Sequence, residues 1–238
     1  FDKMYENYYN YDRITGDVVA EYKDSFGSHN VSAMAGYHAE LYKYKETQAY
    51  RENFPSNSLT DLNGGGTKNM SNKGSSKELA MLSYFGRVNY DFAGKYLLEA
   101  NVRYDGTSRF ARGNRWGFFP SVSAGWRISE EAFFEPLKET VNSAKFRASW
   151  GQLGNQDIGN GYYPTITTMS LGYNYPLGGS IQSGAITATA ANPNLQWETA
   201  TTWGIGLDVT LWNKLNLTLD YYDKTTDGIL MSVPTPVA

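Results

Sequence analysis

The segment Tyr96–Asp105 (YLLEANVRYD) alternates between two kinds of side chain along its whole length. One set is polar except for Leu97, and the other set is apolar or aromatic: Tyr96, Leu98, Ala100, Val102 and Tyr104. Successive side chains of a β-strand point to opposite faces, so the segment predicts a strand with one apolar and one polar face. Eight residues at about 3.3 Å each, tilted by about 40°, span roughly 20 Å, close to the apolar band of a transmembrane β-barrel with its aromatic girdles.

The same alternation recurs along the chain and predicts about eight strands. The alternating segments are residues 13–23, 30–43, 82–92, 96–105, 116–128, 144–152, 197–211 and 215–224. Aromatic residues stand near the ends of several apolar sets, where a membrane barrel meets its two water interfaces. The expected membrane-belt aromatics are Tyr84, Tyr96, Tyr104, Trp116, Trp126, Trp150, Trp197, Trp203 and Tyr221. We therefore expect an all-β fold, an antiparallel transmembrane β-barrel segment.

The opposite face of these strands carries charged and amide side chains. The candidate lumen-facing residues are Arg87, Glu99, Asn101, Arg103, Arg127, Arg147, Glu198 and Asp208. One interpretation is a hydrated wall in which charges are paired with one another. The other is a lumen surface that contacts a plug domain or a passing polar solute.

The connections alternate in length in the way that outer-membrane barrels alternate short periplasmic turns with long extracellular loops. Residues 24–29, 93–95 and 212–214 form short turns, whereas 44–79 and 153–195 are long and rich in turn-forming residues. A medium loop is expected at 106–115, and residues 1–12 look like the end of a loop or strand. Residues 129–142 predict one short helix near 130–140 with Ser129 as its N-cap. Pro120 predicts a bulge or a strand end.

Composition narrows the possible functions. The net charge of −3 provides no basic surface for nucleic acid, and the absence of cysteine excludes disulfides and thiolate chemistry. No run of 18 apolar residues predicts a transmembrane helix, and a mean hydropathy of −0.50 is compatible with a barrel whose alternate residues are polar. The glycine-rich segment 151–161 lacks the Lys-Ser/Thr of a phosphate loop. We expect no catalytic residues, no metal and no cofactor, and interpret His29 and His38 as structural.

Several segments resemble one family. They are FGRVNYDFAGKYLLEANVRYDGTSRF (85–110), RWGFFPSVSAGWRISEEAFFE (115–135), FRASWGQLGNQDIGNGYYP (146–164), residues 192–230 and HNVSAMAGYHAE (29–40). They are similar to SusC/RagA-type TonB-dependent transporters of Bacteroidota outer membranes. The resemblance implies a 22-stranded barrel with an N-terminal plug. It also implies TonB-driven import of oligosaccharides or peptides beneath a SusD-type surface lipoprotein, and no enzymatic activity.

The chain departs from this family in extent. About eight strands are too few for the family's barrel, and neither a plug domain nor a TonB box is recognisable. The opening FDKMYENYYNYD does not look like a signal peptide, which indicates a processed protein or an internal piece. We therefore expect residues 1–238 to be part of a barrel in a Gram-negative outer membrane, in contact with lipid, with TonB coupling supplied by a missing N-terminal region.

Two other classes of protein remain as alternatives. A secreted, aromatic-rich β-sandwich that binds glycans would also alternate along its strands. A barrel enzyme would need a catalytic set on its extracellular rim, with partners that can lie far apart in sequence.

Overall fold

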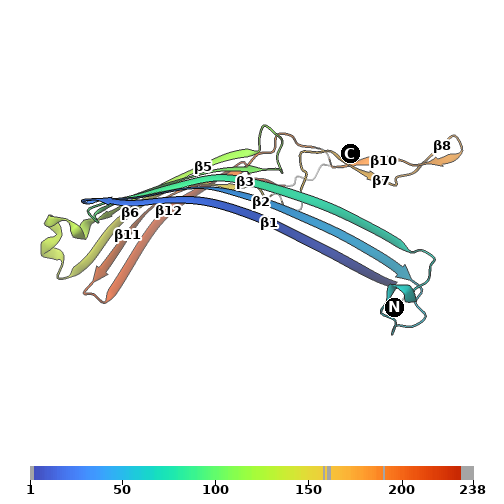
Figure 1. Ribbon diagram of the computed structural model, residues 1–238, viewed down its shortest axis with the longest axis horizontal. Coiled ribbons are helices and arrows are strands. Elements are labelled where there is room, and N and C mark those ends of the chain that lie inside the picture. Colours follow the sequence, from blue (N-terminus) through green and yellow to red (C-terminus); the bar gives the residue numbers. More distant parts are fainter. Residues whose placement is uncertain (1–2, 158, 160–161, 190, 232–238) are drawn as a thin grey trace. The chain divides into compact units, whose positions relative to one another are not determined.

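The computed structural model describes residues 3–157, 159, 162–189 and 191–231. Its main element is an antiparallel sheet of eight strands in the order β1-β2-β3-β4-β5-β6-β11-β12 (Figure 1). These strands are β1 (Lys3–Phe26), β2 (His29–Glu52), β3 (Ser71–Phe92), β4 (Tyr96–Thr107), β5 (Trp116–Arg127), β6 (Val141–Asn155), β11 (Glu198–Leu211) and β12 (Leu215–Asp227). The prediction of an all-β fold with about eight main strands is confirmed.

The remaining elements are small. Two hairpins lie between β6 and β11, namely β7 (Thr168–Leu171) with β10 (Ala185–Thr189), and β8 (Tyr175–Leu177) with β9 (Ser180–Gln182). The described residues also form three 3-10 helices, η1 (Leu62–Gly64), η2 (Ile128–Glu130) and η3 (Ala132–Leu137). Within the described parts of the chain, no helix is long and apolar enough to cross a membrane. A β-sandwich needs two large sheets face to face, and the described residues form one.

The chain divides into two compact units, of which the first comprises residues 1–16 and 39–80. In this unit the connection predicted at 44–79 is shorter than expected: β2 continues to Glu52 and β3 begins at Ser71, which leaves residues 53–70 between the strands. Cross-strand contacts explain the longer strands: the rings of Tyr5 and Tyr50 are 4.7 Å apart, and Gln48 Nε2 donates to Asn7 Oδ1 at 2.6 Å. Residues 44–52 and 71–79 are mostly polar, so a search for apolar alternation misses them.

β1 and β2 are much longer than an ordinary membrane-spanning strand. β1 and β2 contain 24 residues each, whereas a membrane-spanning strand needs about 9–11. β4 and β5 contain 12 residues each, close to that requirement. The first strands are thus long enough to cross an apolar band and continue well beyond it.

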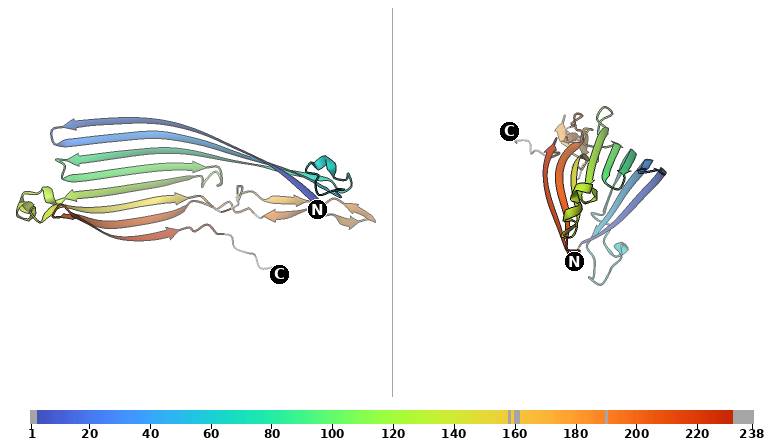
Figure 2. Two further views of the ribbon diagram at one scale, coloured as in Figure 1. Left: turned by 90° about the horizontal axis from the view of Figure 1, so that it is seen from below. Right: turned by 90° about the vertical axis from the view of Figure 1, so that its left-hand side faces the viewer.

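The second unit, residues 17–38 and 81–238, contains all the short turns. Figure 2 shows the turns β1–β2, β3–β4 and β11–β12 at the same end of this unit as the η2–η3 segment. Backbone hydrogen bonds join neighbouring turns: Ala93 N to Ser28 O at 2.6 Å, Arg127 N to Lys95 O at 2.8 Å, and Trp212 N to Thr140 O at 3.0 Å. The loop 108–115 and the described residues between 156 and 197 lie at the other ends of their strands, as the alternation of connection lengths predicts.

Two local predictions need correction. The segment near 130–140 is not one helix capped by Ser129 but two 3-10 pieces, and neither has a side-chain capping hydrogen bond. Ser129 is instead buried, and Pro136 inside η3 cannot donate the backbone hydrogen bond that a longer α-helix would need. Pro120 causes no bulge toward β4, where it faces Val102 in unbroken register. Pairing of β5 with β6 begins only at Ser121.

Candidate functional site

The apolar face of the second unit is exposed rather than packed against another layer. Eight of the nine predicted belt aromatics are exposed, from Trp126 at 37 % to Tyr221 at 62 %. Leu98 and Val102, which lie between Tyr96 and Tyr104 on the same face, are 48 % and 44 % exposed. A contiguous apolar surface of this kind is rare on a soluble monomer and is typical of a surface that meets lipid or another protein.

The exposed aromatics form two rows. Near the short turns, Phe92 stacks on Tyr96 with 6.2 Å between ring centroids, and Trp126 pairs across the strands with both Tyr96 and Phe146. Toward the loops, the ring of Trp116 lies 6.1 Å from that of Tyr84 and 4.7 Å from that of Tyr104. Trp150 faces Trp203, whose ring is 5.6 Å from Tyr221. Sequence reasoning omitted Phe92 and Phe146 from the belt, although Phe92 ends and Phe146 begins the apolar set of its strand.

Trp197 is an exception, and its assignment to the membrane belt is corrected. It precedes β11, is 9 % exposed, and packs edge-on against Phe110 and Phe119 at ring distances of 5.7 and 5.3 Å. Its indole Nε1 donates to the carbonyl of Arg115 at 2.9 Å. The ring therefore closes a small buried cluster at the loop end of the strands. Periodicity extrapolated past the start of β11 placed it on the wrong face.

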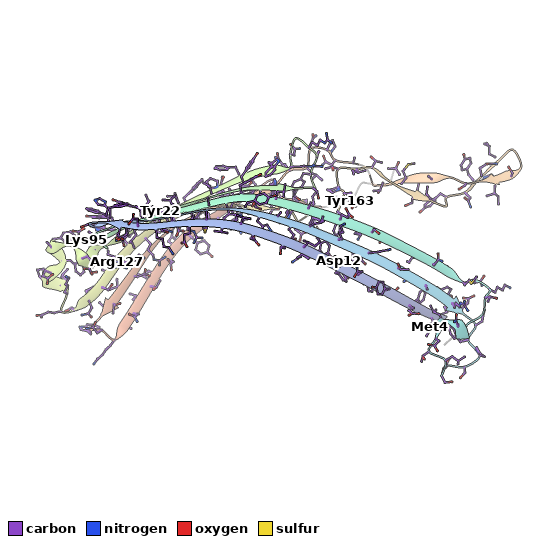
Figure 3. All side chains as sticks on the ribbon, viewed as in Figure 1. Met4, Asp12, Tyr22, Lys95, Arg127 and Tyr163 are labelled. Atoms are coloured by element: carbon purple, nitrogen blue, oxygen red, sulfur yellow. The ribbon has the colours of Figure 1, made fainter. Side chains whose placement is uncertain are left out.

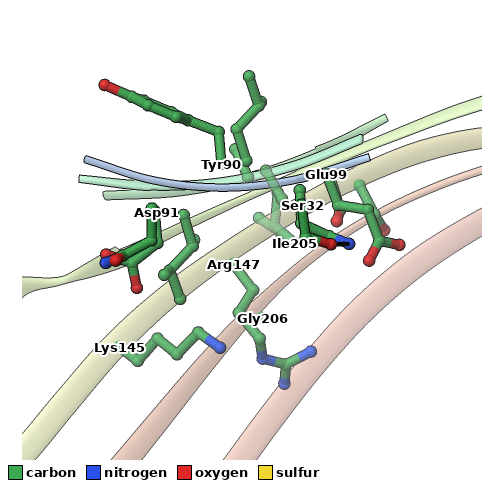
Figure 4. Close-up of a pocket in the computed structure, with 18 of the residues that line it drawn as sticks. Ser32, Tyr90, Asp91, Glu99, Lys145, Arg147, Ile205 and Gly206 are labelled. Carbon is green, nitrogen blue, oxygen red and sulfur yellow. Dashed lines mark hydrogen bonds between the residues drawn. The ribbon is translucent and has the colours of Figure 1, made fainter. Parts of the chain in front are cut away.

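The polar faces of the strands in the second unit line a concavity of about 1080 Å³. Figure 4 shows Asp91, Lys145, Arg147 and Glu99 on one side of the strands and Tyr90 on the other. Glu99 and Arg147 are the only predicted lumen-facing residues among those that line it, within the described part of the chain. The concavity is lined by both signs of charge and by small residues such as Ser123, Ser149 and Gly204.

The best-connected group on this face is centred on Arg147. Its guanidinium donates to Asp208 from Nε at 2.7 Å and from Nη2 at 3.0 Å, and Nη2 also reaches Asp220 Oδ1 at 2.9 Å. The hydroxyl of Thr218 donates to Asp208 Oδ1 at 3.2 Å. A bidentate arginine-carboxylate pair fixes direction as well as charge, so these side chains tie β6, β11 and β12 together.

Four further predicted residues lie in two smaller groups. Arg87 Nε donates to Asn101 Oδ1 at 2.7 Å, and Asn101 Nδ2 donates to Glu99 at 2.8 Å. Arg103 Nη2 contacts Asp105 at 3.0 Å and the Ser83 hydroxyl at 3.3 Å. Asp105 and Ser83 are buried, and sequence reasoning missed them as partners. The sequence pattern could have identified them, since Ser83 and Asp105 belong to the polar sets of their strands, and the two residues face each other in register.

The last two predicted residues lie apart from these groups. Arg127 is exposed at the turn end, close to Lys95 (Figure 3). Glu198 accepts hydrogen bonds from Asn155 Nδ2 at 3.3 Å and from the backbone N–H of Leu230 at 3.1 Å. Most of the predicted polar residues therefore lie in separate hydrogen-bonded groups, and the surface does not concentrate one sign of charge.

Neither histidine is part of a catalytic arrangement in the described residues. His29 Nδ1 lies 2.7 Å from the Tyr90 hydroxyl, and His38 Nδ1 lies 2.7 Å from Asp17 Oδ1. Among the residues that the structure describes, no group of three or more histidine and acidic side chains is placed to hold a metal ion.

Comparison with known proteins gives a consistent result. The family model described as TonB dependent receptor-like, beta-barrel, matches residues 2–238. A protein named TonB-dependent receptor P3, from Formosa agariphila, is 35 % identical over 94 % of this chain and 23 % of its own length. A protein named TonB-dependent receptor SusC, from Bacteroides thetaiotaomicron, is 40 % identical over 66 % of this chain and 16 % of its own.

Solved structures agree with the sequence comparisons. A structure of the RagAB peptide transporter aligns with a TM-score of 0.87 and 30 % identity, over 98 % of this chain and 26 % of that one. The chain thus spans about a quarter or less of the length of the relatives that it matches.

Proposed function

Because this chain belongs to the family of TonB-dependent receptor-like β-barrels, which lie in the outer membrane, we propose that it forms part of the wall of a nutrient transporter. The single observation that supports this most directly is the two-faced sheet of the second unit. Its apolar face is exposed and bears two aromatic rows, while its polar face is hollowed and lined by charges of both signs. A transporter wall needs lipid contact on one side and a hydrated path on the other.

The proposed cargo is an oligosaccharide or a peptide. One similar structure is described as a peptide transporter, and the similar SusC protein is named a TonB-dependent receptor. The partner that we propose is a SusD-type surface lipoprotein that covers the extracellular opening. The mixture of acidic, basic and polar residues on the concave face is compatible with either polar cargo, because it offers hydrogen-bonding groups without a strong field of one sign.

Residues 1–238 contribute only part of the barrel domain in this proposal. A plug domain and a segment that contacts TonB belong to other parts of the full-length protein, and TonB supplies the energy for import. The eight predicted lumen-facing residues face the hydrated interior. The chain has no enzymatic role, and nucleic acid is not a partner.

Uptake by the full-length protein in its own outer membrane tests the proposal. Cells that carry the gene should accumulate labelled oligosaccharides or labelled peptides, and a strain without TonB should lose that uptake. Affinity purification from the membrane should recover a surface lipoprotein at a stoichiometric level. A full-length protein that stays soluble without detergent, or uptake that is unchanged without TonB, would contradict the proposal.

A further inference from the structure

The connection between β5 and β6 exposes apolar side chains at the turn end of the second unit. η3 turns Phe134 inward, where it is 8 % exposed, while the neighbouring Phe133 is 65 % exposed. Leu137, at the end of η3, is 54 % exposed. A short connection that needed only to reverse the chain would have no reason to present a phenylalanine to solvent.

Glu131 holds this connection against the apolar face of the wall. Its carboxylate accepts a hydrogen bond from the Tyr96 hydroxyl at 2.7 Å, from Trp126 Nε1 at 3.1 Å and from Lys95 Nζ at 3.4 Å. The Tyr96 hydroxyl, the Trp126 indole and the Lys95 ammonium together hold the pKa of the Glu131 carboxyl below its usual range. Tyrosine and tryptophan at a membrane interface usually give these donors to water and lipid headgroups, whereas here one side chain of the protein accepts both.

The position of Glu131 brings Phe133 to the aromatic row near the short turns. The ring of Phe133 meets that of Trp126 edge-on, with 6.4 Å between centroids. Trp126 pairs in turn with Tyr96 and with Phe146 on the same exposed face. Phe133 therefore extends the lipid-facing aromatic surface past the end of the strands, onto a segment that lies outside the sheet.

We propose that the η2–η3 connection is an interfacial anchor, in which Phe133 inserts into the headgroup region of the leaflet beside the short turns and Glu131 is the positioning residue. The segment 129–140 contains four glutamates and one lysine, Lys138, whose ammonium is 2.9 Å from Glu135. This acidic character disfavours anionic lipid, and the ammonium group of phosphatidylethanolamine fits it. The inference rests on the outer-membrane location and not on the proposed transport.

Spin labelling of the full-length protein tests this anchor. In a full-length protein without other cysteines, Phe133→Cys carries a nitroxide label, and Lys214→Cys in the β11–β12 turn is the matched control. The proteins are placed in nanodiscs of phosphatidylethanolamine and phosphatidylcholine, and accessibility to oxygen and to a water-soluble nickel chelate is measured. The oxygen-to-nickel ratio should be several-fold higher at position 133 than at 214. Equal ratios would overturn the proposal.

Two further measurements separate the anchor from an incidental exposed side chain. In the Phe133→Cys protein, Glu131→Ala should lower the ratio toward that of the 214 label, and Glu130→Ala, which removes an exposed neighbouring carboxylate, should leave it unchanged. If Glu131→Ala prevents folding, Tyr96→Phe removes one donor and should lower the ratio in part. A ratio that neither variant lowers would refute the positioning role, and a higher ratio in phosphatidylglycerol discs would refute the headgroup assignment.

Discussion

The packing of the buried cluster of Phe110, Phe119 and Trp197 at the loop end leads to a quantitative prediction about two glycines. Gly117 and Gly154 leave room for the ring of Phe119, because a Cβ atom at either position would overlap that ring. Phe119 is 7 % exposed and packs on Trp197. Gly154→Ala should therefore displace the Phe119 ring and cost about 1–3 kcal/mol, the usual penalty for overpacking. Phe119→Ala should cost about 3–5 kcal/mol through lost burial and the cavity it leaves.

The two changes should not be additive. The methyl group that Gly154→Ala introduces would occupy space that the Phe119 ring has vacated, so the double variant should be about 1–3 kcal/mol more stable than additivity predicts. Gly113→Ala is the control, since a Cβ there meets no atom within 4 Å. The assay is hydrogen exchange of full-length protein in detergent, followed through peptides that cover residues 108–119 and 192–200, which reports local opening. Additivity within about 0.5 kcal/mol would refute direct packing of Phe119 over Gly154.

Three further predictions concern the two faces and the turn. Val102→Lys on the exposed apolar face should destabilise the barrel in bilayers by about 2–4 kcal/mol, while Asn101→Lys on the polar face should cost far less; urea titration in liposomes compares them. Arg147→Met leaves Asp208 and Asp220 facing each other, so it should lower the urea midpoint of unfolding. Arg147→Lys keeps the charge but loses the bidentate geometry, so its urea midpoint should lie between those of Arg147→Met and the wild type. Because the folded-state pKa of Glu131 is lowered, its contribution to stability is present above the unfolded-state pKa and is lost as the pH falls through the folded-state value. The hydrogen-exchange protection factors of residues 128–140 should decrease in that acidic range, and Glu131→Ala should abolish this pH-dependent decrease.

Alternation along single strands was sufficient to predict which residues lie together on each face. Leu98 and Val102 are exposed on the same apolar face, and Arg87, Asn101 and Glu99 share hydrogen bonds on the other. The lengths of the connections also predicted which ends of the strands in the second unit meet. These features depend on the two-residue period of a strand and on local turn chemistry, which any short stretch of sequence reveals.

The period of a strand does not say where the strand stops. Residues 44–52 (YKETQAYRE) and 71–79 (SNKGSSKEL) are mostly polar and show no apolar period, and only their places in β2 and β3 show that they are strands. Trp197 follows the apolar period of β11 in sequence but lies before the strand begins, so its ring packs on Phe110 and Phe119 instead. The helix expected near 130–140 failed because the contacts of Glu131 with the wall, together with Pro136, favour a broken 3-10 path.

The sequence alone thus determined the class of fold, the apolar and polar sets within most of the strands, and the alternation of short and long connections. The tertiary structure alone decided which charges neutralise one another, as in the group of Arg147, Asp208 and Asp220 drawn from three strands. It also brought the Glu131 carboxylate within hydrogen-bonding distance of Tyr96 and Trp126. Periodicity is a local property of the chain, whereas a partner across strands depends on register, and register is set by contacts between residues far apart in sequence.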